Sequence, residues 1–357
     1  MATPDDPQDD ATPGWDAITA AFEPLYPGQE PRHVGPVIPW QFNGNDPLDG
    51  ISAWQRLEPV PHWHFVSYGL SELYDKASDN PALSGYGFEL TFRLACDPDE
   101  VDPPAWAFSL FQNLARYVFQ SGNVFEDGHW MNLNGPIALG SDTLIGSLAF
   151  VLDPEVPQID TPHGRVAFIQ LVGLTVDEEA AGKRWDARKM LDTLLPHMPL
   201  WITDISRASL LDRDDIRAAL DAGSARDGSS TAMLFNEALG WTQRSRLLRT
   251  DLTTITIGAN HVENILTLLR LRLPFGNELR LIGPEKYIMI EPGEANGLVP
   301  EKEQLRVTLT RATVDALATT LRPRAGIYTV PGLDTVRWDI RQTQIKDAEG
   351  KVVETIG

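Results

Sequence analysis

The sequence has a single cysteine, Cys96, in 357 residues, so no disulfide can form within the chain. It has no apolar run close to the roughly 20 residues that a membrane-spanning helix needs. The first 13 residues contain four Asp and no Lys or Arg, whereas a secretory signal peptide starts with basic residues. These absences exclude a disulfide scaffold, a membrane span and a secretory signal. They predict a cytoplasmic protein that does not act on a membrane.

Basic residues are also few, with 30 Lys and Arg against 50 Asp and Glu and a formal net charge of −20. The excess lies in residues 1–254, which carry 37 acidic and 17 basic side chains, while residues 255–357 carry 13 of each. A strongly acidic surface repels phosphate backbones, so we expect no nucleic-acid partner. A basic protein or peptide segment is a better complement, although an acidic excess also serves solubility alone.

The change in charge at residue 254 indicates two structural units, and nine of the ten Trp also precede it. We predict a disordered acidic tail at 1–13, an N-terminal lobe at 14–204, a connecting segment at 205–250 and a C-terminal lobe at 251–357. Strand and helix patterns are mixed without regular βαβ alternation, which favours the α+β class.

Apolar spacing locates the secondary structure. Helices are expected at 15–26, 103–120 and 184–195, from near 260, and at 311–321. Strands are expected at 64–69, 87–94, 144–152, 166–175, 252–257, 278–282, 287–291 and 305–309. In 87–94, apolar residues alternate with Glu89, Thr91 and Arg93, the pattern of a half-buried strand.

Familiar catalytic motifs are missing. There is no G-x-S-x-G turn, phosphate-binding glycine loop or dinucleotide fingerprint, so we expect no cofactor. His62 and His64 form an H-x-H pair that would point the same way on a strand, as zinc ligands do. A metal-dependent hydrolase that adds His129 or His163 is therefore one alternative, and two structural histidines are the other. We expect no metal site.

Four runs of residues, in this order and spacing, resemble the N-terminal lobe of the Suppressor of fused family. They are residues 45–49 (NDPLD), 61–74 (PHWHFVSYGLSELY), 84–94 (SGYGFELTFRL) and 114–121 (LARYVFQS). Weaker echoes at 161–164, 168–173 and 201–204, and fainter ones at 271–276 and 309–317, extend the resemblance to about residue 320. It implies two mixed α/β lobes with predominantly antiparallel sheets. The long disordered insertion of animal members is missing, which favours a bacterial origin.

Animal Suppressor of fused is a cytoplasmic negative regulator of Hedgehog signalling whose lobes close around a short extended motif of Gli transcription factors. By this resemblance, Tyr117 is a partner-contacting tyrosine at the end of the long helix. His129 stands where animal members have a partner-contacting aspartate, and Asp127 takes that role only if the loop shifts. The other residues expected to contact a partner are Trp130 in the first lobe and Asn260, Glu263 and Asn264 in the second.

The sequence therefore predicts a non-catalytic module that clamps a polypeptide segment between two lobes. Bacterial members of the family are thought to include immunity proteins that neutralise partner toxins, and a basic toxin surface would suit the acidic lobe. A general regulatory scaffold without a single partner is the remaining alternative to immunity.

Overall fold

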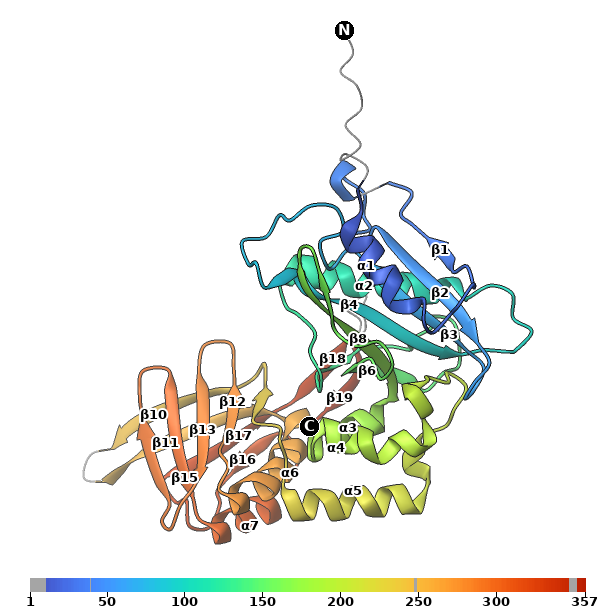
Figure 1. Ribbon diagram of the computed structural model, residues 1–357. Coiled ribbons are helices and arrows are strands. Elements are labelled where there is room, and N and C mark those ends of the chain that lie inside the picture. The colour runs from blue at the N-terminus through green and yellow to red at the C-terminus, as the bar shows by residue number, and fades with distance from the viewer. Residues whose placement is uncertain (1–10, 39, 247–248, 347–351) are drawn as a thin grey trace. The chain divides into compact units, whose positions relative to one another are not determined.

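The computed structural model describes residues 11–38, 40–246, 249–346 and 352–357 (Figure 1). The chain divides into two compact units: Met1–Ala180 with Ala187–Arg217, and Ala181–Asp186 with Ala218–Gly357. Ten of the 13 residues of the expected tail lie outside the described residues, and helix α1 begins at Pro13. The lobe boundaries drawn from composition stay predictions.

The first unit is built on one sheet of eight strands in the order β1-β2-β3-β4-β8-β6-β5, with β7 also paired to β8. β4 and β8 run parallel, and the other neighbours are antiparallel. The strands are Arg32–Val34 (β1), Gly50–Arg56 (β2), His62–Tyr68 (β3), Leu83–Ala95 (β4), Trp130–Asn132 (β5), Ile145–Leu152 (β6), Ile159–Thr161 (β7) and Gly164–Thr175 (β8). The helices are Pro13–Phe22 (α1), Ala105–Ser121 (α2), Val176–Arg184 (α3), Ala187–Leu194 (α4) and Asp214–Asp227 (α5), and α3 and α5 both continue into the second unit.

Helices α1 and α2 cover opposite faces of this sheet (Figure 1). On the α2 face, Phe65 of β3 packs edge-on against Phe108 at 5.5 Å between ring centroids. On the α1 face, Phe22 stacks on Trp54 of β2 at 5.2 Å. Because both faces are covered, all seven residues of β3 are buried.

The expectation of a half-buried strand at 87–94 is wrong in one respect. The strand is present within β4, but its polar residues Glu89, Thr91 and Arg93 are fully buried, like the apolar residues between them. Alternation of apolar and polar residues shows that the two faces of a strand differ in chemistry. It does not show that the polar face is exposed to solvent. Here the polar face lies on the α1 side, where buried partners satisfy it.

The second unit contains two larger sheets, with strand orders β10-β11-β17-β16 and β14-β15-β13-β12-β9, and a separate two-stranded sheet of β18 and β19. Helices α6 (Val262–Arg272) and α7 (Arg311–Thr320) join both sheets in one apolar core. The strands are Met233–Phe235 (β9), Gly240–Arg246 (β10), Arg249–Gly258 (β11), Leu279–Ile282 (β12), Tyr287–Pro292 (β13), Gly297–Pro300 (β14), Gln304–Leu309 (β15), Gly326–Tyr328 (β16), Val336–Arg341 (β17), Thr343–Lys346 (β18) and Val352–Ile356 (β19).

Here the alternating pattern does mean one buried face. In β15, Leu305, Val307 and Leu309 are buried while the residues between them are partly exposed. Helix α7 begins where its sequence predicts, because the Thr310 hydroxyl accepts a hydrogen bond from the Thr313 amide at 3.2 Å.

The α+β class with mainly antiparallel sheets is confirmed. Within the described ranges, the chain forms no helix with the length and apolar character that a membrane crossing requires.

Candidate functional site

Tyr117 is placed at the C-terminal end of α2, which stops at Gly122 because that residue adopts a left-handed φ of 71°. Its side chain is 39% exposed. The phenol oxygen accepts a hydrogen bond from Asn123 at 2.9 Å, and the ring lies 5.7 Å from that of Phe125. Phe125 in turn stacks on Phe150 of β6 at 4.0 Å. The half-exposed ring of Tyr117 is thus supported by the buried rings of Phe125 and Phe150.

Asp127 and His129, the two candidates for the position of the partner-contacting aspartate, lie in the loop after α2. Contacts within the fold hold both of them. Asp127 pairs with Arg188 of α4 at 2.8 Å and accepts the Leu152 amide at 3.2 Å. His129 is half-exposed, and its Nδ1 accepts the Glu126 amide at 3.2 Å. A neutral ring that accepts at Nδ1 carries its proton on Nε2, and this nitrogen lies 4.0 Å from the Glu126 carboxylate of the same loop.

Four of the predicted residues therefore gather at one place in the first unit: Tyr117, Asp127, His129 and Trp130, the last being the first residue of β5. Asp127 is already held by Arg188, whereas the side chain of His129 is half-exposed beside Glu126. We call this place the α2–β5 corner. The roles of these residues in binding stay predictions.

The other three predicted residues lie in the second unit, at the start of α6. Asn260 accepts a hydrogen bond from the Thr343 hydroxyl at 2.9 Å, which ties this end of the helix to β18. Glu263 is exposed in the first turn and Asn264 is partly buried. Their proposed contacts with a partner likewise stay predictions.

His62 and His64 are buried, and both ring nitrogens of His64 are engaged within the fold, whereas the buried Nε2 of His62 has no hydrogen-bond partner among the described residues. His62 Nδ1 lies 2.6 Å from the Val60 carbonyl. His64 Nδ1 lies 2.8 Å from the Tyr26 hydroxyl, and its Nε2 lies 3.2 Å from Asp153. Burial lowers the pKa of both histidines to about 4, so both are neutral at pH 7. The described ranges hold no group of three or more His, Cys, Asp or Glu placed to bind a metal ion.

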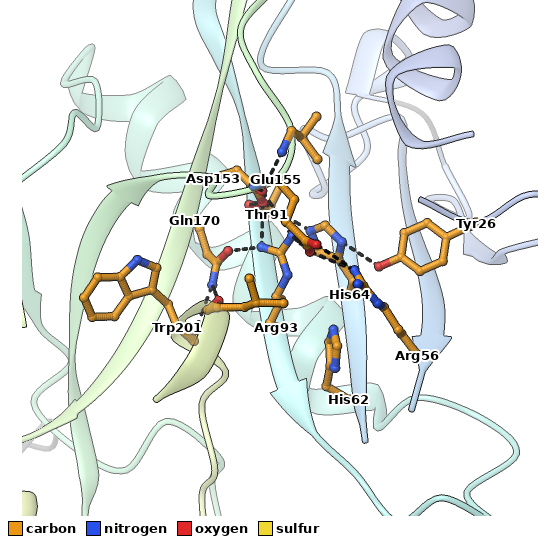
Figure 2. Close-up of polar contacts among 12 residues, drawn as sticks. Tyr26, Arg56, His62, His64, Thr91, Arg93, Asp153, Glu155, Gln170 and Trp201 are labelled. Atoms are coloured by element: carbon orange, nitrogen blue, oxygen red, sulfur yellow. Dashed lines mark hydrogen bonds and ion pairs between the residues drawn. The ribbon is translucent and has the colours of Figure 1, made fainter. Parts of the chain in front are cut away.

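His64 belongs to a buried polar network that sequence reasoning missed (Figure 2). At its centre Arg93 and Asp153, both fully buried, pair through two contacts of 2.8 and 3.1 Å. Thr91 donates to Asp153 at 2.8 Å. Burial alone would raise the pKa of Asp153, but hydrogen bonds from His64 and Arg93 and the arginine charge hold it well below its usual range.

The network reaches the protein surface through Glu155. Arg93 contacts Glu155 at 2.9 Å, and Arg56 of β2 contacts the same carboxylate at 2.8 Å. Two arginines therefore face Asp153 and Glu155, so the network is formally neutral. Buried charges are tolerated when they are paired in this way.

Gln170 links this network to a strained turn. Its amide oxygen accepts from Arg93, and its amide nitrogen donates to the Leu200 carbonyl at 2.8 Å. Leu200 and Trp201 both have left-handed backbones, with φ of 53° and 57°. Such conformations are costly for residues with a side chain, so they need surrounding contacts to hold them.

A second buried carboxylate on the same face has no basic partner among the described residues. Glu89 accepts hydrogen bonds from the Ser67 and Ser71 hydroxyls and from the Gly69 and Ser71 amides, at 2.5 to 3.0 Å. Burial raises its pKa to about 7 in spite of these donors. Glu89 fixes the turn between β3 and the segment before β4.

Comparison with known proteins supports the family resemblance. Residues 44–208 match the model of the Suppressor of fused protein (SUFU) family. The human Suppressor of fused homolog is 35% identical over 236 residues, which cover 61% of this chain and 48% of the human protein. The chain thus matches about half the length of that relative.

Two solved structures extend the comparison. The crystal structure of Drosophila Suppressor of Fused covers 94% of this chain and 99% of its own, with a TM-score of 0.78 and 22% identity, so the two share a fold. A chain in the crystal structure of the Sufu–Fu complex is 29% identical over 60% of this chain and 98% of its own, with a TM-score of 0.56. The resemblance that the four sequence runs indicate is confirmed.

Proposed function

We propose that this protein is a non-catalytic module that binds a polypeptide segment, and the premise is the match of residues 44–208 to the Suppressor of fused family model. The α2–β5 corner carries the proposal. There a half-exposed tyrosine and a half-exposed histidine are each held by contacts with the short segment between them, Tyr117 by Asn123 and Phe125 and His129 by the Glu126 amide. A related chain was crystallised in a complex, the Sufu–Fu complex, which supports a protein as the partner.

The chemistry of the corner suits recognition better than catalysis. Tyr117 offers an aromatic surface with little freedom left to lose, because Asn123 and Phe125 already hold it. His129 offers one hydrogen-bond donor, and Asp127 is neutralised by Arg188. Such prearranged aromatic and polar groups bind well because few rotamers are immobilised on association.

We further propose that the partner segment is basic, since residues 1–254 carry 37 acidic and 17 basic side chains. Closure of two lobes on the segment, with Asn260, Glu263 and Asn264 contributing, belongs to the same proposal. Neutralisation of a toxin is a narrower form of it and rests on the family resemblance and the acidic charge.

The test is affinity capture from a lysate of the source organism at low salt, with wild type, Tyr117→Ala and His129→Ala compared. We expect one protein to be retained by wild type and to bind each variant at least about tenfold more weakly in titration calorimetry. Tyr74→Ala is the matched control, because Tyr74 is a similarly exposed tyrosine outside the corner. Capture that is equal in all four proteins, or no capture at all, would contradict the proposal.

A further inference from the structure

A pocket of about 610 Å³ opens on the first unit, away from the residues predicted from sequence. Two short loops line it, one immediately before β6 and one after Thr203, which forms an isolated β-bridge with Leu94. Its size lies within the range of sites that hold a small ligand or a large side chain. The lining residues are Ser141, Asp142, Thr143, Leu144, Ile205, Ser206, Arg207 and Ala208.

Both walls of the pocket are fixed before anything binds. In the first wall, the Ser141 hydroxyl donates to the Ala138 carbonyl at 2.7 Å and the Thr143 hydroxyl accepts the Ile145 amide at 3.1 Å. In the second wall, Arg207 makes two contacts of 2.6 Å with the fully buried carboxylate of Glu178. A preformed site avoids the entropic cost of ordering its own loops.

The accessible chemistry of the pocket is apolar with one negative charge. Glu178 cancels the charge of Arg207, so the arginine does not make this an anion site. Leu144 is 59% exposed, and together with Ile205 and Ala208 it supplies apolar surface. Asp142 is exposed and has no ion-pair partner in the part of the chain that the structure describes. An apolar side chain with a basic neighbour complements this combination.

The sheet register places the pocket in line with the α2–β5 corner. The His129 carbonyl accepts the Phe150 amide, so these two residues face each other across the β5–β6 ladder. Leu144 precedes Phe150 by six positions along the same strand and its entry. At about 3.3 Å per extended residue, the pocket therefore lies about 20 Å from His129 along the sheet.

We propose that the pocket receives an apolar anchor side chain of the segment bound at the α2–β5 corner, about six residues from the one that contacts His129, with a Lys or Arg beside the anchor. This inference rests on the proposed binding function and adds a sequence requirement to it. The partner of this chain is thus a segment with two contact points. One binds the α2–β5 corner, and the other is an apolar residue with a basic neighbour that binds the pocket.

The experiment selects random 14-residue peptides displayed on phage against the full chain and measures the affinity of the best synthetic peptide by fluorescence anisotropy. We expect an apolar residue next to Lys or Arg at a fixed position in the selected sequences. Leu144→Asp should weaken this peptide about 10- to 100-fold, since it removes the burial of one large apolar side chain. Asp142→Lys should weaken it about twofold to fivefold, as expected for one exposed ion pair.

Leu139→Asp is the matched control, because Leu139 is 89% exposed in the same loop but does not line the pocket. It should change affinity by less than about twofold, and a peptide with its anchor replaced by Ser should no longer distinguish Leu144→Asp from wild type. Circular dichroism checks that each variant is folded.

The outcomes separate the two proposals. Peptides that lose affinity with Tyr117→Ala and His129→Ala, but respond equally to Leu144→Asp and Leu139→Asp, would leave the binding function standing and overturn the pocket. Peptides that bind Tyr117→Ala and His129→Ala as tightly as wild type would show that the corner is not the binding surface. They would also overturn the proposal that one segment binds both the corner and the pocket. Failure to select any peptide would count against both.

Discussion

The two faces of the eight-stranded sheet are equally buried but chemically different. The face under α2 is apolar, with Phe65, Leu90 and Phe92 among its residues. The face under α1 combines an apolar cluster with the paired charges of Arg93 and Asp153. Burial of apolar groups is favourable wherever it occurs, whereas a buried charge depends on its own partners. On the first face, the loss of unfolding free energy caused by a substitution should therefore increase with the side-chain volume removed. On the second face, that loss should depend on whether the remaining charges are still paired.

The largest effect is expected from Asp153→Ala, which leaves Arg93 buried without its main partner. We expect a loss of about 3–5 kcal/mol in the free energy of unfolding of the first unit, measured by urea denaturation. Asp160→Ala, at an exposed position on β7, should change it by less than about 0.5 kcal/mol. Replacing both charges, as Arg93→Met with Asp153→Leu, should cost less than Asp153→Ala alone. If the double variant were the less stable of the two, the contrast between the faces would fail.

On the apolar face, Leu114→Ala removes a buried side chain of α2. We expect a loss of about 3 kcal/mol from lost transfer energy and the cavity that remains. Because no ionisable group is involved, the loss should be the same at pH 5 and pH 7.5 in urea titrations. A loss that depended strongly on pH would show that the two faces are coupled.

The polar face should respond to pH through Glu89. Its pKa in the folded protein is about 7, above the ordinary value of 4.5, so the folded state holds a proton that the unfolded state has lost. Its contribution to stability should therefore decline as pH rises from about 4.5 to 7. From pH 5 to 7 this amounts to about 2 kcal/mol.

Glu89→Gln isolates this contribution. His62 and His64 have lowered pKa values, so they destabilise the protein as pH falls and oppose the effect of Glu89. The measurement is therefore the difference in unfolding free energy between variant and wild type, which should shift in favour of the variant by about 2 kcal/mol from pH 5 to 7. A difference that is constant across this range would contradict the assignment.

The smallest effect is expected from Asp127→Ala, which breaks an ion pair between the same residue types at the surface. The two side chains are 39% and 45% exposed, so solvent screens their interaction. We expect a loss of less than about 1 kcal/mol in thermal or urea unfolding, well below that of Asp153→Ala. Comparable losses for the two aspartates would show that burial is not what separates them.

Much of the fold follows from local sequence patterns. Helix α7 was predicted at 311–321 and is found at Arg311–Thr320, because Thr310 supplies a cap that sequence alone reveals. Strand β15 was predicted at 305–309 and is found at Gln304–Leu309, because its apolar alternation matches a single buried face. These are local causes acting on local residues.

The buried network could not be predicted in the same way. Arg93 and Asp153 are 60 residues apart, and nothing in the local pattern of either pairs them. The polar residues at alternate positions in β4 do indicate a distinct face of the strand. That face is predicted to be exposed unless both faces of the sheet are known to be covered. At the α2–β5 corner, Tyr117 and His129 were named through the family resemblance, while the tie between Asp127 and Arg188 needs the folded structure.

The fork of Arg93 also constrains how this sequence can change over generations. Its guanidinium contacts Asp153, Glu155 and Gln170, and Gln170 in turn donates to the Leu200 carbonyl in the turn with left-handed backbone. A single replacement at any of these sites leaves a buried charge or hydrogen-bond donor without a partner. A tolerated change therefore requires simultaneous substitutions at two sites. Substitutions at these sites are therefore expected to be slow and correlated, in contrast to substitutions at exposed positions.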